Sequence, residues 1–228
     1  MQKEDEGLRE CLAQCRLLAF DVDGTLTDSI KQIILCFQRT FEHAHLPIPD
    51  EDAIKGTIGM SLHLGVQSLL PDPTDERLGA EVTQLYRDTF AVSKDIHGTN
   101  LFPDVLETLR QLKARGYILA IASGKSKVGV QRVFNDIPEF NELFSLVCTG
   151  DMSESKPSPA MMQYIAAKAE VPMDQIMGVG DALLDIQMFR NARCHELGVL
   201  SGVCDYYALD DAQSEFILPK VTDLRAYL

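Results

Sequence analysis

Two carboxylates separated by one residue follow a short apolar segment near the start of the chain. Residues 17–20 read Leu-Leu-Ala-Phe, and Asp21, Val22, Asp23 and Gly24 come directly after them. An apolar run of this length is typical of a buried strand, and parallel sheets bind ligands beyond the carboxyl ends of their strands. Buried acids are costly unless a metal, a proton or hydrogen bonds compensate them. The same residues also fit an ordinary acidic turn, so the rest of the chain must decide between the two interpretations.

Polar residues also follow three later apolar segments. After the segments 117–122, 144–148 and 176–179 come, in order, Ser123 with Gly124, then Lys156, and then Asp181 with Asp185. Each has an ordinary alternative, because serine and aspartate cap helices and a lysine or an aspartate can be solvated on a helix surface. Their coincidence at successive strand ends favours one shared site.

Phosphoryl transfer is the chemistry that fits this set. Lys156, the Ser123 hydroxyl and the Gly124 amide can bind a dianionic phosphate. A carboxylate about 4 Å from a phosphate repels it by about 1 kcal/mol per charge pair in water, and by several-fold more in a drier site. Mg²⁺ bound by Asp21 and Asp181 would remove that conflict. One aspartate could then attack phosphorus, and a second acid could protonate the leaving oxygen and later activate water.

The remaining pattern predicts an α/β fold, with a Rossmann-like parallel sheet covered by helices on both faces. A short helix is expected over residues 1–15. Strands are predicted over 16–21, 117–122, 144–148, 176–179, 196–200 and 216–218, and they alternate with helices over 103–115, 126–134, 157–169 and 182–191.

An inserted α-helical cap domain is predicted over residues 29–98. Apolar residues recur at helical spacing from Ile30 to Phe41 and through 50–95, and this stretch contains no strand candidate. The α/β core domain would then comprise residues 1–28 and 99–228. We expect hinges near 27–29 and 96–100, where Gly98 provides backbone freedom.

Composition restricts the possible partners. The chain of 228 residues has 21 Lys and Arg against 34 Asp and Glu, a net charge of −13, which disfavours nucleic acid. No apolar stretch approaches the roughly 18 residues of a membrane span, and the amino-terminal residues do not resemble a signal peptide. The six cysteines are scattered and form no CxxC motif. We therefore expect a cytoplasmic monomer or homodimer that has no membrane partner, structural disulfide or zinc site and that acts on a small phosphorylated metabolite.

Four segments together resemble the motifs of the haloacid dehalogenase-like hydrolase superfamily, in the same order. They are Asp21 to Thr27, Ser123, Lys156-Pro157, and Gly180-Asp181 with Asp185. The match covers nearly the whole chain, and the helical insertion is similar to the small helical cap of that superfamily. Residues 102–116 further resemble the phosphoglycolate phosphatase-like branch.

The resemblance implies a role for each matching residue. Asp21 would be the nucleophile and Asp23 the general acid and base, while Ser123 and Lys156 would hold the phosphoryl group. Mg²⁺ would be bound by Asp21, the backbone carbonyl of Asp23, and Asp181, with Asp185 in support. The reaction implied is hydrolysis of a phosphomonoester through an aspartyl-phosphate.

Departures from the family pattern leave the substrate open. Asp23 argues against the dehalogenating and phosphonate-cleaving relatives, which lack this acid. Ile33 stands where mutases of the β-phosphoglucomutase type carry a histidine, and Ser123-Gly124-Lys125 replaces the more frequent Thr-Asn-Lys of phosphoglycolate phosphatases. Phosphoglycolate, a sugar phosphate and a nucleotide all remain candidates. A phosphomutase, a receiver-like phosphate acceptor and a non-catalytic phosphate-binding protein are the alternative functions.

The start of the predicted second cap helix is the candidate specificity segment. We hypothesise that Gly59, Met60, Ser61 and His63 face the active site when the cap closes. The alternative is that Met60 and Leu62 belong to the core of the helical bundle.

Overall fold

The computed structural model describes residues 2–93 and 98–228, and its centre is one parallel sheet. The strand order is β3-β2-β1-β4-β5-β6, which confirms the predicted α/β fold. The strands are β1 (Leu17–Phe20), β2 (Ile118–Ser123), β3 (Phe144–Thr149), β4 (Ile176–Gly180), β5 (His195–Val199) and β6 (Phe216–Leu218).

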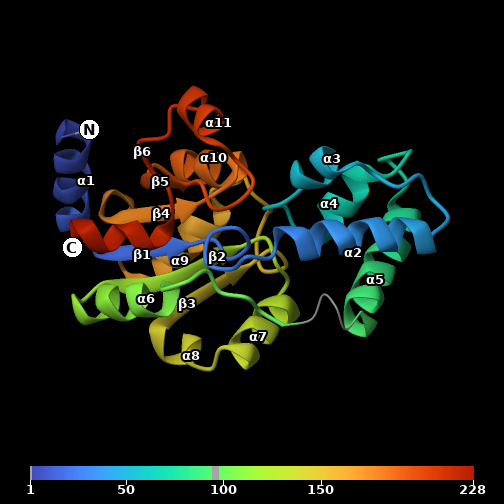
Figure 1. Ribbon diagram of the computed structural model, residues 1–228, viewed down its shortest axis with the longest axis horizontal. Helices are drawn as coiled ribbons and strands as arrows, with labels where there is room; N and C mark the ends of the chain where they lie inside the picture. Colours follow the sequence, from blue (N-terminus) through green and yellow to red (C-terminus); the bar gives the residue numbers. More distant parts are fainter. Residues whose placement is uncertain (1, 94–97) are drawn as a thin grey trace.

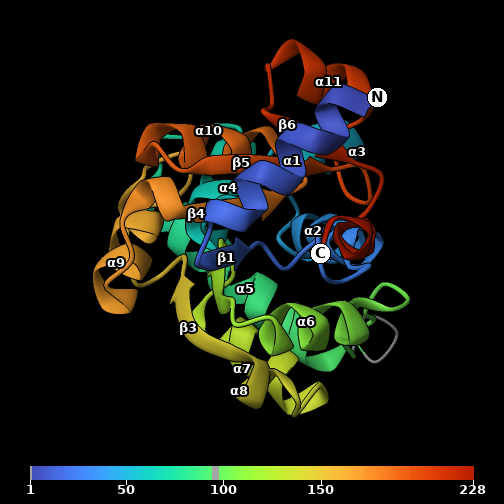
Figure 2. The ribbon, with the colours of Figure 1, turned by 90° about the vertical axis from the view of Figure 1, so that its left-hand side faces the viewer.

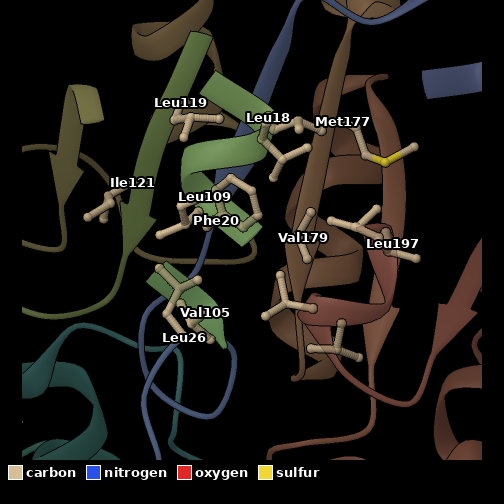
Figure 3. Packing of buried hydrophobic residues seen from close by; sticks show 14 of the residues in the cluster. Leu18, Phe20, Leu26, Val105, Leu109, Leu119, Ile121, Met177, Val179 and Leu197 are labelled. Atoms are coloured by element: carbon tan, nitrogen blue, oxygen red, sulfur yellow. The ribbon is translucent and has the colours of Figure 1, made fainter. Parts of the chain in front are cut away.

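The central strand β1 is apolar throughout because both faces of the sheet are covered. All four of its residues are fully buried. Leu18 and Phe20 belong to one hydrophobic cluster, whereas Leu17 and Ala19 belong to the cluster on the opposite face, as the alternation of side chains along a strand requires. Figure 3 shows Phe20 lying beside Leu109 on the first of these faces.

Helices pack on both faces of the sheet (Figures 1 and 2). The cluster around Phe20 includes residues of α1 (Gln2–Gln14), α6 (Val105–Ala114), α7 (Lys127–Asp136), α8 (Phe140–Leu143) and the final 3₁₀ helix η3 (Val221–Tyr227). The opposite cluster includes residues of α9 (Ala160–Ala169) and α10 (Leu183–Ala192). The sequence pattern missed four short elements, which are α8, α11 (Tyr206–Asp211), η2 (Met173–Gln175) and η3.

The predicted start of α9 was wrong by three residues. The pattern placed Pro157 at the first helical position, but the helix begins at Ala160 after Pro159. Residues 155–158 form a turn instead, in which the Ser158 amide donates to the Ser155 carbonyl at 3.0 Å. Pro159 suits the start of a helix equally well, since its missing N–H would have no intrahelical partner there.

Four helices form the predicted insertion between β1 and α6. They are α2 (Ile30–His43), α3 (Glu51–Lys55), α4 (Leu62–Leu69) and α5 (Glu76–Val92), and the described residues between 29 and 98 contain no strand. These helices share their own hydrophobic cluster, which includes Phe37, Phe41, Ile54 and Val66. Figure 1 places them at the end of the molecule away from both chain termini. The bounds of the two domains stay a prediction.

The two segments that connect the helical insertion to the core lie side by side. Thr27 and Leu101 form an antiparallel bridge, and the Asp28 amide donates to the Asn100 carbonyl at 2.8 Å. Residues 96–97 of the second predicted hinge lie outside the described residues.

Among the described helices, none combines the length and the apolar character that a membrane crossing requires. All six cysteines are free.

We expect the replacement Leu109→Ala to lower the free energy of unfolding by about 2–5 kcal/mol, because it leaves a cavity in a close-packed core. Leu109 is fully buried in the cluster around Phe20. Leu64→Ala is the matched control, since Leu64 is 48% exposed and its truncation should change stability by only about 0.5 kcal/mol. Urea denaturation measures both. Equal losses in the two variants would contradict this description of the core.

Candidate active site

The carboxyl edge of the sheet gathers the acids that follow β1 and β4. The Asp21 amide donates to the Val179 carbonyl at 2.9 Å, which extends the β1–β4 pairing and fixes Asp21 at this edge. Asp181 follows β4 directly, and Asp185 lies on the first turn of α10. Carboxylate oxygens of these three aspartates lie within 4.8 Å of one another, and all three residues are buried.

Lys156 joins this cluster from the loop after β3. Its Nζ donates to Asp21 Oδ1 at 2.6 Å and to Asp185 Oδ1 at 2.5 Å. The second oxygen of Asp185 accepts from the Ala182 amide at 3.1 Å, so this carboxylate is held on both sides. Lys156 is 3% exposed, and the interpretation of a solvated lysine is therefore wrong.

Asp181 is held by the loop after β1 and by the loop after β5. The Thr25 hydroxyl donates to Asp181 Oδ1 at 2.7 Å, and the Val203 amide donates to Asp181 Oδ2 at 2.9 Å. The ordinary interpretation, in which the Asp181 side chain caps α10, is therefore wrong. Gly24 has φ of 81°, and a Cβ at this position would overlap the carboxylate of Asp181. Glycine is required there for both reasons.

Burial dominates the electrostatics of the cluster. It raises the pKa of Asp21 to about 7, with Lys156 opposing the rise and Asp185 and Asp23 adding to it. Burial also raises the pKa of Asp181, together with the charges of Asp185 and Asp21. Burial alone would lower the pKa of Lys156, but the charges of Asp185 and Asp21 raise it overall. The ammonium group therefore stays charged at neutral pH.

The donor set fits a hard divalent cation. The negative charge of the three buried carboxylates is larger than the single positive charge of Lys156, their one ion-pair partner among the described residues. Buried charge that is not compensated is strongly unfavourable. Oxygen ligands of this kind suit Mg²⁺, which is bound through one or two carboxylates and a substrate phosphate. Asp21, Asp181 and Asp185 are the side chains that could hold such an ion.

The carboxylate of Asp23 lies apart from this cluster. It accepts a hydrogen bond from the Ser29 hydroxyl and forms an ion pair with Lys125, whose Nζ is 2.9 Å from Oδ2. The two adjacent acids therefore have different partners. Asp21 binds the buried lysine of the core, and Asp23 binds the residue just before α2 and the lysine that follows β2.

Ser123 and Gly124 lie at the end of β2, beside the cap. The Ser123 side chain is buried, and its hydroxyl accepts from the Lys125 amide at 3.3 Å. A Cβ on Gly124 would overlap the carbonyl oxygens of Gly59 and Met60. The glycine thus lets the cap loop lie directly against the core.

A cavity of about 590 Å³ separates the core from the cap. Core residues that line it include Asp21, Asp23, Ser123, Gly124 and Lys125, and cap residues that line it include Ile33, Phe37, Ile58, Tyr86 and Phe90. Lys156, Asp181 and Asp185 do not line it and lie buried behind Asp21. The cavity therefore has a charged floor and a largely apolar roof.

The residues of the candidate specificity segment lie in two different environments. Gly59, Met60 and Ser61 line the cavity, and the Ser61 amide donates to the Ser155 hydroxyl of the core at 2.8 Å. His63 does not line the cavity. Its Nδ1 lies 3.2 Å from the Thr83 hydroxyl, and its Nε2 lies 3.5 Å from Glu76 within the cap.

Sequence reasoning missed several residues of the site. Thr25, Ser29 and Lys125 hold the aspartates, and Arg87 and Arg132 line the cavity. Lys125 and Thr25 lie inside the segments already singled out, so their position could have indicated a role. No local signal marks Arg87 or Arg132, because they reach the cavity from two helices that are distant in sequence.

Comparison with known proteins identifies the family. A haloacid dehalogenase-like hydrolase family model matches residues 18–199. A phosphoglycolate phosphatase from Mannheimia succiniciproducens is 30% identical over 220 residues, which cover 93% of this chain and 97% of that protein. The chain belongs to the haloacid dehalogenase-like hydrolases.

Solved structures share the fold. A haloacid dehalogenase-like hydrolase from Bacteroides fragilis superposes with a TM-score of 0.83 at 25% identity, covering 92% of this chain and 99% of the other. A structure from Bacteroides vulgatus, described as a β-phosphoglucomutase, has a TM-score of 0.82 at 16% identity and covers 98% of this chain and 94% of its own. At that identity the second likeness concerns the fold alone.

We expect Lys156→Met to destabilise the metal-free protein at neutral pH by about 3–5 kcal/mol, because it removes the cation from a buried ion cluster. Urea denaturation in the presence of EDTA measures this loss, and added Mg²⁺ should restore part of it. Lys125→Met is the matched control, since its ion pair with Asp23 is partly exposed and should contribute about 1 kcal/mol or less. Wild-type stability in Lys156→Met would contradict the charge balance described above.

Proposed function

We propose that the protein is a Mg²⁺-dependent phosphomonoesterase that hydrolyses a small phosphorylated metabolite through an aspartyl-phosphate. The observation that carries the proposal is the pair Asp21 and Asp23 at the floor of one cavity, each held by a different lysine. Family membership and the relatives named phosphoglycolate phosphatases support the same reaction.

Asp21 is the proposed nucleophile. Lys156 holds its Oδ1 at 2.6 Å, which leaves Oδ2 available for attack on the phosphorus of a substrate in the cavity. The attack forms the bond between Asp21 and phosphorus and breaks the bond to the leaving oxygen. Ser123 and Gly124, which line the cavity, and Lys156, which lies behind Asp21, are proposed to bind the phosphoryl oxygens, since a hydroxyl, an amide and an ammonium group can stabilise the developing charge. Lys156 would have to reach these oxygens past Asp21.

Asp23 is the proposed general acid and base. The Ser29 hydroxyl and Lys125 hold its carboxyl group, and it lies at the cavity beside Asp21. It would donate a proton to the leaving oxygen and later accept one from the water that attacks the aspartyl-phosphate. A site that only binds phosphate would not need this second acid.

The metal would be held by Asp21, the backbone carbonyl of Asp23, and Asp181, with Asp185 in support. When bound, Mg²⁺ supplies positive charge that offsets the repulsion between phosphate and carboxylates. Thr25 and the Val203 amide keep Asp181 oriented toward the cluster, and Lys156 with the Ala182 amide does the same for Asp185.

The alternative function is a phosphomutase of the β-phosphoglucomutase type, because the Bacteroides vulgatus structure described as a β-phosphoglucomutase has the same fold. Ile33 argues against it, because this cavity-lining residue cannot transfer a proton. A receiver-like acceptor would be phosphorylated once without turnover, and a non-catalytic relative would not react. Mg²⁺-dependent turnover of a generic phosphomonoester therefore separates the phosphatase from the receiver-like and the non-catalytic candidates, and net release of inorganic phosphate separates it from the mutase.

The cavity favours a leaving group larger than glycolate. Its volume of about 590 Å³ lies within the roughly 300–1,000 Å³ typical of pockets for drug-sized ligands. Ile33, Ile58, Tyr86 and Phe90 give it an apolar roof, which a small carboxylate would leave largely unfilled. Among the candidate substrates, we favour a nucleotide or another phosphomonoester with a ring in its leaving group. We further propose that the enzyme is a cytoplasmic monomer or homodimer.

Asp23→Asn should lower kcat by about 10²–10⁴-fold, because the amide can neither donate nor accept the transferred proton. Asp21→Asn should abolish turnover and phosphorylation of the protein, whereas Asp23→Asn should accumulate phosphorylated protein because hydrolysis of the intermediate slows. Rapid quenching with a labelled phosphomonoester measures both, and a chelator should stop the wild-type reaction. Undiminished turnover by Asp21→Asn would exclude the proposed mechanism.

A phosphomonoester with an aromatic or nucleoside leaving group should have a kcat/KM about tenfold or more above that of phosphoglycolate, since about 1.4 kcal/mol of apolar burial is enough for that ratio. Met60→Ala should reduce the preference because Met60 lines the cavity. His63→Ala is the matched control from the same segment and should leave the preference unchanged. If no ester is hydrolysed, the phosphatase proposal itself fails, whereas a preference for phosphoglycolate contradicts only the size argument.

A further inference from the structure

A second cluster of metal-ligating side chains lies at the opposite edge of the sheet from the candidate active site. Helix α1 crosses the sheet near the amino ends of β4, β5 and β6 (Figure 2). Cys11 belongs to this helix, His195 begins β5, and Glu215 directly precedes β6. The Cys11 sulfur, a ring nitrogen of His195 and a carboxylate oxygen of Glu215 lie within 4.8 Å of one another.

Cys15 adds a fourth candidate ligand. It follows Cys11 by four residues at the end of α1, a spacing that places two side chains on one helix face. The Cys15 thiol, together with burial, raises the pKa of Cys11. Both cysteines are buried, so the pair faces the protein interior rather than solvent.

Hydrogen bonds already orient the other two side chains. His195 Nδ1 lies 3.0 Å from both carboxylate oxygens of Glu215. The Glu196 amide donates to Glu215 Oε2 at 3.3 Å.

We propose that four side chains form a zinc site that fastens α1 to the amino edge of the sheet: Cys11, Cys15, His195 and Glu215. Thiolate, imidazole and carboxylate are the ligands that Zn²⁺ takes in tetrahedral protein sites. The sulfur ligands distinguish the site from the oxygen-only cluster around Asp21, because thiolates select zinc over magnesium.

The observed spacing is close to that of a tetrahedral site. Bond lengths of about 2.0–2.3 Å to zinc place its ligand atoms roughly 3.3–3.8 Å from one another. The ligand atoms of Cys11, His195 and Glu215, which lie within 4.8 Å of one another, reach such positions through small side-chain rotations. The Cys15 sulfur is not among these atoms and would have to move further. Binding would release the thiol protons, so zinc affinity should rise with pH.

The site has a route to solvent. A surface cavity of about 390 Å³ is lined by His195, Glu215, Asp174 and Arg193, among others. Arg190, which also lines it, is occupied by Glu196 and the Gln213 carbonyl. A cation could therefore enter beside His195 and Glu215, which line this cavity.

Helix α1 is already attached to the core at several points. Leu8 and Leu12 pack into the core, Arg9 reaches the carbonyl of Ala226, and Tyr117 donates to the Leu12 carbonyl at 2.9 Å. These contacts hold the helix to the carboxyl-terminal segment and to the start of β2. Zinc would add a link from its last turn to β5 and to the start of β6.

The test uses Co²⁺ as a spectroscopic probe on the full-length protein, with a reductant and with excess Mg²⁺ to occupy the oxygen-ligand cluster. We expect one Co²⁺ per chain, with sulfur-to-cobalt charge-transfer absorption and the intense visible bands of a tetrahedral ion. Zn²⁺ should displace it. Cys11→Ser and Cys15→Ser should each reduce the charge-transfer band and weaken binding, whereas Cys204→Ser is the matched control and should bind as the wild type does.

Glu215→Gln and His195→Gln keep both thiols and provide a second test if the serine variants fail to fold. Each should weaken Co²⁺ binding by about 100-fold or more, since residues that merely support a ligand already account for roughly 10–100-fold. The absence of charge-transfer absorption in the wild type would overturn the proposal. So would unchanged affinity in folded Glu215→Gln and His195→Gln, because the metal would then be bound by cysteines alone.

Discussion

The buried ion cluster around Lys156 is the constraint on which the rest of the structure depends. One ammonium group contacts Asp21 and Asp185, and Asp181 lies within reach of the same carboxylates. Such a set is unstable in a dry interior unless its excess charge is neutralised. Burial raises the pKa of Asp21 to about 7, and the charges of Asp185 and Asp23 add to the rise, so a proton can neutralise part of the cluster when no cation is bound. A bound cation would therefore offset the negative charge of the cluster, which otherwise repels a phosphate.

The strand order of the sheet brings these groups together. Placing β1 between β2 and β4 puts Asp21 next to the residues that follow both neighbours. Lys156 must then come from the longer loop after β3, and it can reach the cluster only by being buried. The cap completes the arrangement, because its loop at Gly59 and Met60 lies directly on Gly124 and covers the floor that these strand ends form.

The sequence predicted the strand-end residues well, because their position depends on local order. An acid that directly follows an apolar strand must lie at the carboxyl edge, whatever surrounds it. His63 and Arg132 could not be placed in this way, since the direction of a helix side chain depends on which face packs against its neighbours. The three-residue error at α9 has a similar cause, because Pro157 and Pro159 both suit a helix start and only the turn at 155–158 decides between them.

The amino edge of the sheet shows why chemistry assembled from distant segments escapes sequence reasoning. Cys11 and Cys15 form no recognised metal motif, and His195 and Glu215 stand far from them in the sequence. For this reason the sequence predicted no zinc site, and the proposed site at this edge would correct that prediction. They meet only because α1 lies across the starts of β5 and β6. The two edges then offer different ligand sets, oxygen alone at the carboxyl edge and sulfur and nitrogen beside one carboxylate at the amino edge, which favours hard cations at the first and softer cations at the second. The strands between them are held by their own backbone pairing, so an ion at one edge need not displace groups at the other.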